Sequence, residues 1–334
     1  MKLRKILISL IAPGILCLAL SACYKQAETA EFFAMDTFMR VTVCGKGADA
    51  ALTEVQQYVN SLEQRLSVTR PGSEISLLNE NGSAQVSAET ASLIESALRL
   101  SDRCGGRFDI TVSPAVDAWG FYTDEYRVPS ESELEALRER IDYTRVRVDG
   151  SAVTLGEGQR IDLGGIAKGY ASREICNILD KNGVRSALIV LGGSIQLVGA
   201  KPDGTAWRVG LQDPDGSDDY LGIWSGCECA LVTSGDYQRC FEQDGTRYHH
   251  ILNPDTAAPA RSDLRSVTIL GGDPVLGDAY STALYVMGAE KACEFWRGDP
   301  AYDMILYTRD GRLLLTPGAA DSFETSLPTE VIEP

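Results

Sequence analysis

Short segments with helical or strand-like periodicity alternate along this chain, with no long linker, repeat or low-complexity tract between them. Such alternation favours one core shared by helices and sheet over two separable domains. We therefore predict an α+β fold, a single intertwined unit of mainly antiparallel sheet with packed helices. Helices are expected at 49–66, from residue 87, at 130–139, 166–179 and 278–296, and strands at 32–44, 108–112, 146–148, 152–155, 160–163, 187–191, 194–198, 304–307 and 313–315, with further short strands up to residue 246.

The first 22 residues have the features of an export signal. Three of the first five residues are basic, and they precede an apolar stretch, residues 6–20, that is too short to span a bilayer comfortably. The sequence Leu-Ser-Ala-Cys, ending at Cys23, resembles a bacterial lipobox, in which the cysteine is acylated and the chain is cut just before it. An ordinary secretory signal with a chance cysteine is the alternative. We expect a signal peptide over 1–22, a lipid on Cys23, a tether over 23–31, and a protein anchored to the cell membrane facing outside the cytoplasm.

The charge balance argues against two classes of partner. The chain has 31 Lys and Arg against 47 Asp and Glu, a formal net charge of −16. Such acidity disfavours a sequence-independent grip on nucleic acid phosphates, so we expect no nucleic-acid partner. The sequence also lacks an obvious polybasic patch for a membrane surface, and two histidines are too few for a His-rich metal site.

A strand, a glycine loop and a helix are predicted to follow one another in residues 160–170. Gly164 and Gly165 allow backbone N–H groups to approach an anion, and the N-terminus of a helix adds positive potential. Lys168 adds a positive charge in the first turn. The pattern is typical of a phosphate site, although a plain tight turn with a surface lysine fits the same stretch taken alone.

Two further stretches carry side chains suited to catalysis. Asp278 and Thr282 are four residues apart on a predicted helix and so share one face, where a carboxylate and a hydroxyl are hard oxygen ligands for Mg²⁺. The alternative is a helix cap at Asp278 with Thr282 as a filler. The only two histidines are adjacent, His249 and His250, and on a strand they point to opposite faces, so they are not expected to act as one pair.

These stretches and several others occur in an order that resembles the ApbE family, the FAD:protein FMN transferases. The motifs are Met35-Asp36-Thr37, Ser67, Ser73-Glu74-Ile75-Ser76, residues 105–109, Trp119-Gly120-Phe121, residues 162–170, Leu191-Gly192-Gly193, Thr233-Ser234-Gly235, His249-His250-Ile251 with Pro254, and residues 278–282. The resemblance spans about residues 30–320. It implies a transferase domain over 32–320 and a C-terminal tail over 321–334.

The resemblance also implies a reaction and roles for individual residues. FMN is moved from bound FAD onto a Thr or Ser hydroxyl of a target membrane flavoprotein subunit, and AMP leaves. His250 aligns with the reactive-site histidine of the family. By position, the residues implied to contact FAD are Met35, Asp109, Asp162, Gly165, Lys168 and Ile251, and those implied to hold magnesium are Asp278, Thr282 and the carbonyl of Ala167.

The chain departs from the family pattern at three places. Thr69 stands where the family often has a tyrosine, so an aromatic ring that could stack on the flavin is missing there. Arg107 replaces a small residue, and Ala257 replaces the glycine of a Pro-x-Thr-Gly motif. These differences bear on affinity and substrate choice more than on the reaction.

Two other functions fit the same motifs. One is a Mg²⁺-dependent FAD pyrophosphatase, which gives FMN and AMP with water as the acceptor. The other is a non-catalytic FAD-binding lipoprotein, against which the presence of Asp278, Thr282 and His250 argues. The identity of the general base also has two candidates, because an aspartate in the site could take the hydroxyl proton in place of His250.

Overall fold

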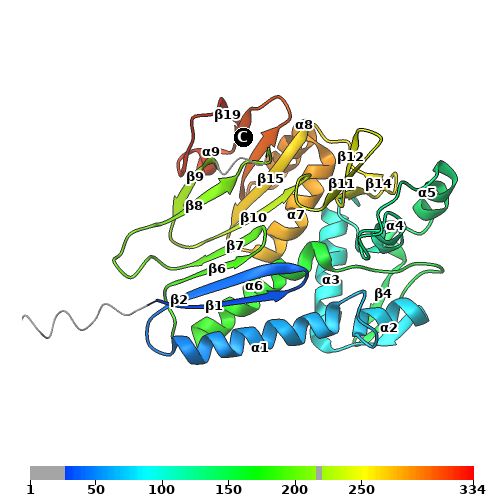
Figure 1. Ribbon diagram of the computed structural model, residues 1–334, viewed down its shortest axis with the longest axis horizontal. Helices are drawn as coiled ribbons and strands as arrows, with labels where there is room; N and C mark the ends of the chain where they lie inside the picture. Colours follow the sequence, from blue (N-terminus) through cyan, green and yellow to red (C-terminus); the bar gives the residue numbers. More distant parts are fainter. Residues whose placement is uncertain (1–26, 216–219) are drawn as a thin grey trace, which may run out of the picture.

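A nine-stranded sheet is the centre of the fold in the computed structural model, which describes residues 27–215 and 220–334 (Figure 1). Neighbouring strands are antiparallel except for β17 and β19, which are parallel. The α+β prediction with a mainly antiparallel sheet is confirmed. In sheet order the strands are β1 (Ala27–Ala34), β2 (Thr37–Cys44), β6 (Ala187–Leu191), β7 (Ser194–Val198), β10 (Cys229–Gly235), β15 (Leu264–Gly271), β16 (Asp303–Thr308), β17 (Leu313–Leu315) and β19 (Thr329–Val331).

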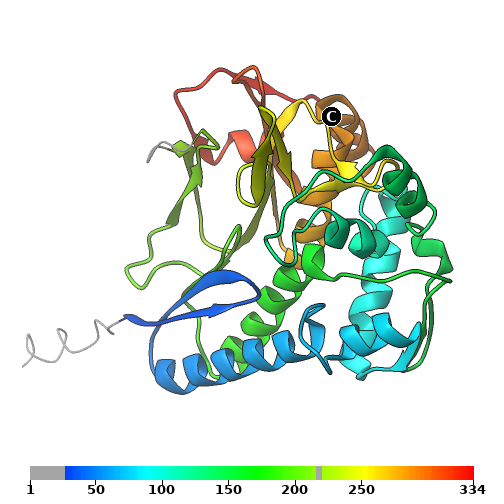
Figure 2. The same ribbon diagram turned by 45° about the vertical axis from the view of Figure 1, so that its right-hand side comes forward.

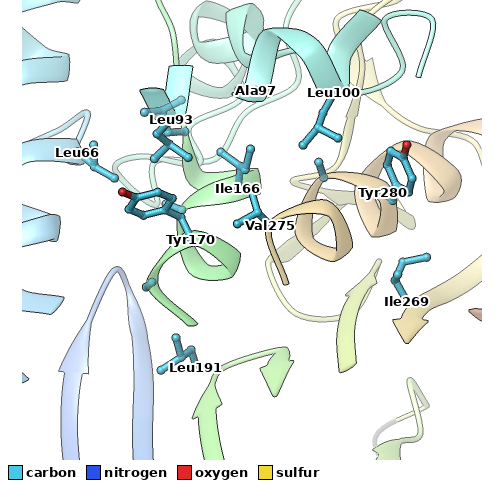
Figure 3. Packing of buried hydrophobic residues seen from close by; sticks show 14 of the residues in the cluster. Leu66, Leu93, Ala97, Leu100, Ile166, Tyr170, Leu191, Ile269, Val275 and Tyr280 are labelled. Atoms are coloured by element: carbon cyan, nitrogen blue, oxygen red, sulfur yellow. The ribbon is translucent and has the colours of Figure 1, made fainter. Parts of the chain in front are cut away.

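Helices cover one face of this sheet. α1 (Ala48–Leu66) runs along the β1–β2 hairpin, α6 (Gly164–Lys181) packs on β6 and β7, and α7 (Pro274–Met287) packs on β10 and β15. Figure 2 shows α3 (Ala88–Arg103, cyan) to the right of α6 and α7, on their side away from the sheet. Their apolar stripes meet the sheet in the main core, shown in Figure 3 by Leu66, Leu93, Ala97, Leu100, Ile166, Tyr170, Leu191, Ile269, Val275 and Tyr280. Burial of this continuous apolar surface is the main force that holds the helices on the sheet.

The other face of the sheet carries a second, smaller core. A three-stranded sheet of β8 (Trp207–Gln212), β9 (Tyr220–Gly226) and β18 (Phe323–Glu324) packs there, with Trp224 and Val209 against Leu231 and Leu270 of the large sheet. Strands β10 and β15 are therefore apolar on both faces, which explains their nearly continuous burial.

Shorter elements complete the side of the molecule around α3 and α4. A third apolar cluster includes Trp119 and Phe121. The remaining elements are α2 (Glu74–Asn81), β3 (Ser83–Gln85), the 3₁₀ turns η2 (Ile110–Val112) and η3 (Tyr143–Arg145), α4 (Ser113–Ala118), α5 (Glu131–Arg138), β4 (Arg147–Asp149), β5 (Ala152–Thr154), β11 (Cys240–Gln243), β12 (Thr246–His249), β13 (Leu252–Asn253), β14 (Ala258–Pro259), α8 (Ala289–Gly298) and α9 (Pro317–Ala320).

Several predicted elements differ from the structure. The helix expected over 278–296 is two helices, because Gly288 has a φ of 81° and ends α7 before α8 begins. Residues 108–112 form no strand, since the Asp109 side chain accepts a hydrogen bond from the Thr111 backbone N–H and starts a 3₁₀ turn. Residues 160–163 are also not a strand, because the Asn79 side-chain amide, rather than a neighbouring strand, pairs with the backbone of Ile161.

The ends of the domain also differ from expectation. Strand β1 begins at Ala27, so most of the expected 23–31 tether is part of the sheet. The expected C-terminal tail, 321–334, contributes β18 and β19, and β19 pairs with β17. The signal peptide predicted over 1–22 and the lipid site at Cys23 lie outside the described residues. In the described ranges, no helix combines the length and the apolar character that a membrane span requires.

Candidate functional site

A cavity of about 1150 Å³ opens between the tip of the β1–β2 hairpin, the start of α6, the end of β10 and the side of α7. Segments far apart in the sequence meet around it. The residues that the resemblance assigned to FAD, magnesium or catalysis all line this cavity: Met35, Asp109, Asp162, Gly165, Ala167, Lys168, His250, Ile251, Asp278 and Thr282. The structure thus brings the whole predicted set together, while the individual roles stay predictions.

The first turn of α6, where the sequence predicted a phosphate site, forms one wall of the cavity. Asp162 holds this turn in place, since its Oδ1 accepts a hydrogen bond from the Gly164 N–H at 2.8 Å and its Oδ2 accepts one from the Tyr122 hydroxyl at 2.9 Å. Burial and the nearby Asp162 raise the pKa of Tyr122 well above its usual value, so the hydroxyl remains a donor. The Lys168 Nζ lies 3.3 Å from the Gly164 carbonyl oxygen, which adds a cation to the positive end of an 18-residue helix.

A close approach of two helices positions the predicted metal ligands. The Gly169 N–H of α6 donates to Oδ2 of Asp278 in α7 at 2.9 Å. A Cβ atom on Gly169 would lie 2.1 Å from the Pro274 carbonyl oxygen, so only glycine permits this packing. Asp278 is 4% exposed, and Thr282 one turn later has its hydroxyl 3.3 Å from that of Ser234 at the end of β10.

The donor set at this point suits Mg²⁺. The predicted ligands are all oxygen atoms, namely the carboxylate of Asp278, the hydroxyl of Thr282 and the main-chain carbonyl of Ala167, and the three residues line the cavity. Mg²⁺ prefers few protein oxygens together with waters and substrate phosphates. Across the described ranges, 27–215 and 220–334, no group of three or more His, Cys, Asp or Glu side chains is arranged to hold a metal ion.

Asp109 lines the cavity but is largely buried in its wall. Its Oδ1 accepts hydrogen bonds from the N–H and the hydroxyl of Thr111, at 2.8 and 2.6 Å, and its Oδ2 accepts one from the Tyr143 N–H at 3.0 Å. Burial raises the pKa of this carboxyl group. The observed contacts give Asp109 a part in shaping the loop, and contact with FAD would add to them.

His250 reaches the cavity from the end of the β11–β12 hairpin. Its backbone N–H donates to the Arg239 carbonyl oxygen at 3.0 Å, and its Nδ1 lies 3.3 Å from the same oxygen, which orients the ring. Burial, and secondarily the cation of Arg239, lowers the pKa of His250 to about 3. The imidazole is therefore neutral over the physiological range in the substrate-free site, and a bound anion nearby would raise its pKa and make it a stronger base.

His249 has a different environment, as the sequence predicted. It is buried, with Nε2 3.1 Å from the Ala260 carbonyl oxygen and 3.4 Å from the Tyr285 hydroxyl oxygen. Burial lowers its pKa as well. The two histidines thus face the core and the cavity respectively, and of the two only His250 lines the cavity.

The tip of the β1–β2 hairpin forms the opposite wall. Met35 and Asp36 make a two-residue turn in which both have positive φ, 50° and 56°. Such a turn matches the twist of the strands but is strained for residues with side chains. The Met35 N–H donates to Oε1 of Glu63 at 2.9 Å, which ties the strained tip to α1.

Three arginines line the cavity that the sequence argument did not place there. Arg107 pairs with Asp255 at the cavity wall, and the Arg239 guanidinium donates to the Phe121 carbonyl oxygen. Arg70 lies in the loop after α1, beside Thr69. Arg70 stands in a recognisable Thr-Arg-Pro-Gly loop, whereas the position of Arg239 depends on how the β11–β12 hairpin folds back and has no signal in the sequence.

Comparisons with known proteins agree with this architecture. The sequence profile of the ApbE family matches residues 35–306. The FAD:protein FMN transferase of Treponema pallidum is 33% identical, and the match covers 92% of each chain. The FAD:protein FMN transferase of Vibrio cholerae is also 33% identical, over 72% of this chain and 74% of the relative.

Solved structures give the same result. The ApbE protein of Thermotoga maritima superposes with a TM-score of 0.81 at 31% identity, covering 86% of this chain and 96% of the other. The flavin transferase ApbE of Vibrio cholerae superposes with a TM-score of 0.76 at 27% identity, covering 91% and 98%. In sequence and in fold, the chain belongs to the ApbE family.

Proposed function

We propose that this protein is a Mg²⁺-dependent FAD:protein FMN transferase, which moves FMN from FAD to a Thr or Ser hydroxyl of a target flavoprotein and releases AMP. The observation that carries the proposal is the convergence of Lys168, His250, Asp278 and Thr282 on one cavity. The relatives that bear this enzyme name support it.

In this proposal the start of α6 binds the diphosphate of FAD. The positive end of the α6 dipole, the Gly165 N–H and the Lys168 ammonium present positive charge to the phosphate oxygens, while the N–H groups of Gly164, Ile166 and Ala167 are held within the turn. Asp278, Thr282 and the Ala167 carbonyl would hold magnesium, which when bound neutralises charge on the phosphates of FAD. Because Asp162 and Tyr122 fix the turn before substrate arrives, little reorganisation is needed at the moment of reaction.

In this proposal His250 accepts the proton of the acceptor hydroxyl. The acceptor hydroxyl oxygen attacks the phosphorus of the FMN half, its proton passes to the neutral imidazole, and the bond from that phosphorus to the AMP phosphate oxygen breaks. The aspartates are less suited to this role. Asp109 and Asp162 accept hydrogen bonds on both carboxylate oxygens, and one oxygen of Asp278 is occupied by Gly169.

Membrane attachment through a lipid on Cys23 is part of the proposal. It is supported by the lipobox-like sequence, and only four positions of sequence separate Cys23 from Ala27, where β1 begins. Four residues reach at most about 14 Å when fully extended. A lipid there would hold the domain close to the bilayer, where a membrane flavoprotein subunit also lies.

The test is incubation of the protein with FAD, Mg²⁺ and candidate flavoprotein subunits, followed by in-gel flavin fluorescence and AMP measurement. We expect a fluorescent acceptor band that needs Mg²⁺ and is lost in His250→Ala, while the exposed-site control Asp180→Ala keeps it. FMN and AMP without any protein adduct would favour the pyrophosphatase, with water as acceptor. FAD binding without AMP would favour a non-catalytic flavin-binding protein.

A further inference from the structure

The outward face of the β1–β2 hairpin is a ladder of four cross-strand pairs, which begins with Ala27 opposite Cys44. Thr29 faces Thr42, with their hydroxyl oxygens 3.0 Å apart, and Glu31 faces Arg40, with an ion pair of 2.5 Å. The last pair, nearest the turn, is Phe33 opposite Phe38. The ladder therefore changes from polar to aromatic at the end that borders the cavity.

The Phe33–Phe38 pair is exposed to an unusual degree. Phe33 is 69% exposed and Phe38 is 53% exposed, and they are the exposed phenylalanines of the described residues. Phe38 lines the cavity, whereas Phe33 stands outside it. Two exposed phenylalanines paired across neighbouring strands are typical of an interaction surface, because aromatic side chains supply large contact area at low entropic cost.

The hairpin holds this pair in a fixed position. The opposite face of the hairpin packs on α1, and the Met35 N–H to Glu63 hydrogen bond fastens the tip. β1 is also the end strand of the nine-stranded sheet, so within the described chain its outer edge has no strand partner (Figure 1). A free strand edge can pair with an extended peptide.

The cavity has room for a second reactant. Its volume of about 1150 Å³ exceeds the range of roughly 300–1,000 Å³ that is usual for a site holding one small ligand. Transfer to a protein requires a segment of the acceptor to enter beside FAD, and the Phe33–Phe38 pair leads directly to that opening.

We infer that the Phe33–Phe38 pair and the free edge of β1 dock an extended segment of the acceptor polypeptide, whose Thr or Ser hydroxyl then enters the cavity past the hairpin tip. This inference rests on the proposed transferase function. Phe33 lies outside the cavity lining, so a variant at Phe33 should change docking of the acceptor without changing FAD binding. A second copy of this chain is the competing occupant, and the experiment below distinguishes it.

The experiment compares Phe33→Ser with Val331→Ser, a control at an exposed apolar residue (50% exposed) on β19, the other edge strand of the same sheet. Each variant is checked for its thermal unfolding midpoint, its FAD dissociation constant by flavin fluorescence, and its oligomeric state. The KM for the acceptor is then measured with a recombinant flavoprotein subunit that the unaltered enzyme flavinylates. Phe33→Leu, which keeps an apolar side chain, is included as a rescue.

We expect Phe33→Ser to raise the acceptor KM by about tenfold, with FAD affinity unchanged, Phe33→Leu intermediate and Val331→Ser unaltered. Equal acceptor KM values for Phe33→Ser and the unaltered enzyme would overturn the docking inference, as would a matching loss of FAD affinity. A dimer that Phe33→Ser dissociates, with acceptor KM unchanged, would assign the pair to self-association. If the unaltered enzyme flavinylates no acceptor at all, the proposed function itself fails and the docking inference falls with it.

Discussion

The backbone N–H of Gly169 donates to Oδ2 of Asp278 at 2.9 Å, across 109 positions of sequence. This bond joins α6, whose first turn faces the cavity, to α7, which carries the predicted metal ligands. The same contact that packs two core helices therefore also aims a buried carboxylate at the site. Several consequences can be measured.

Gly169→Ala should separate the two helices. Its Cβ would lie 2.1 Å from the Pro274 carbonyl oxygen and 2.9 Å from Cβ of Asp278. Relief of the first clash requires a shift of the α7 backbone, which costs more free energy than a side-chain rotation. We expect a loss of about 1–3 kcal/mol in the free energy of unfolding, measured by urea titration, together with weaker Mg²⁺ activation. The control is Gly298→Ala at the end of α8, where nothing lies within 4 Å of the added atom. Equal stability of the two variants would contradict the packing argument.

Asp278→Asn should separate metal binding from folding. The amide keeps the size of the side chain and can still accept the hydrogen bond from Gly169, but it removes the negative charge that attracts Mg²⁺. We expect the Mg²⁺ concentration for half-maximal activity to rise at least about tenfold, with FAD binding changed less. Unaltered Mg²⁺ dependence in a folded variant would remove Asp278 from the metal site.

The two histidines should not titrate in the usual range. Burial lowers the pKa of both, for His250 to about 3, so the folded protein binds their protons only at lower pH than the unfolded chain does. Their contribution to stability is complete above about pH 6.5 and is lost as the pH falls below that value. We expect the imidazole proton NMR signals of His250 in the substrate-free enzyme to stay fixed from pH 8 to pH 5.5, and those of His249 to titrate with a midpoint below pH 6.5, with His250→Gln used for assignment. A midpoint near pH 6.5 for His250 would show that it titrates as a solvated imidazole.

Asp236 should be critical for stability. It is 1% exposed and is bound by Arg265 at 3.1 Å and Arg309 at 2.7 Å, at the end of β10 next to the site. Removing its charge takes a buried partner from Arg265, which keeps Asp215, and from the half-exposed Arg309, so Asp236→Ala should cost about 1–3 kcal/mol. Asp180→Ala, which breaks an exposed ion pair with Arg185, should change the unfolding midpoint little. Similar effects of the two variants in a thermal melt would refute this account.

The features that the sequence predicted well depend on local geometry. Asp278 and Thr282 share a helix face because of their spacing, and the two glycines before Lys168 start α6 at the cavity. Ser87 and Ser130 cap α3 and α5 through their side chains, close to the predicted starts. Each of these results needs only the residues within a few positions.

The features that the sequence missed depend on tertiary contacts. Residues 32–44 look like one strand because Met35-Asp36 is not an Asn-Gly type of turn, and the strained turn exists only with the support of Glu63 from α1. The burial of Asp109 requires Tyr143, which lies 34 positions away. Arg239 reaches the cavity only because its hairpin folds back against Phe121.

The central claim is that the site transfers FMN to a hydroxyl of another protein. The most direct measurement is intact-mass spectrometry of an acceptor subunit and its Thr→Ala or Ser→Ala variant after incubation with FAD and Mg²⁺, with AMP quantified in the same samples. We predict one FMN added per acceptor, one AMP released per FMN added, and no adduct on the hydroxyl-less variant. Release of FMN and AMP with no mass change on any acceptor would contradict the account.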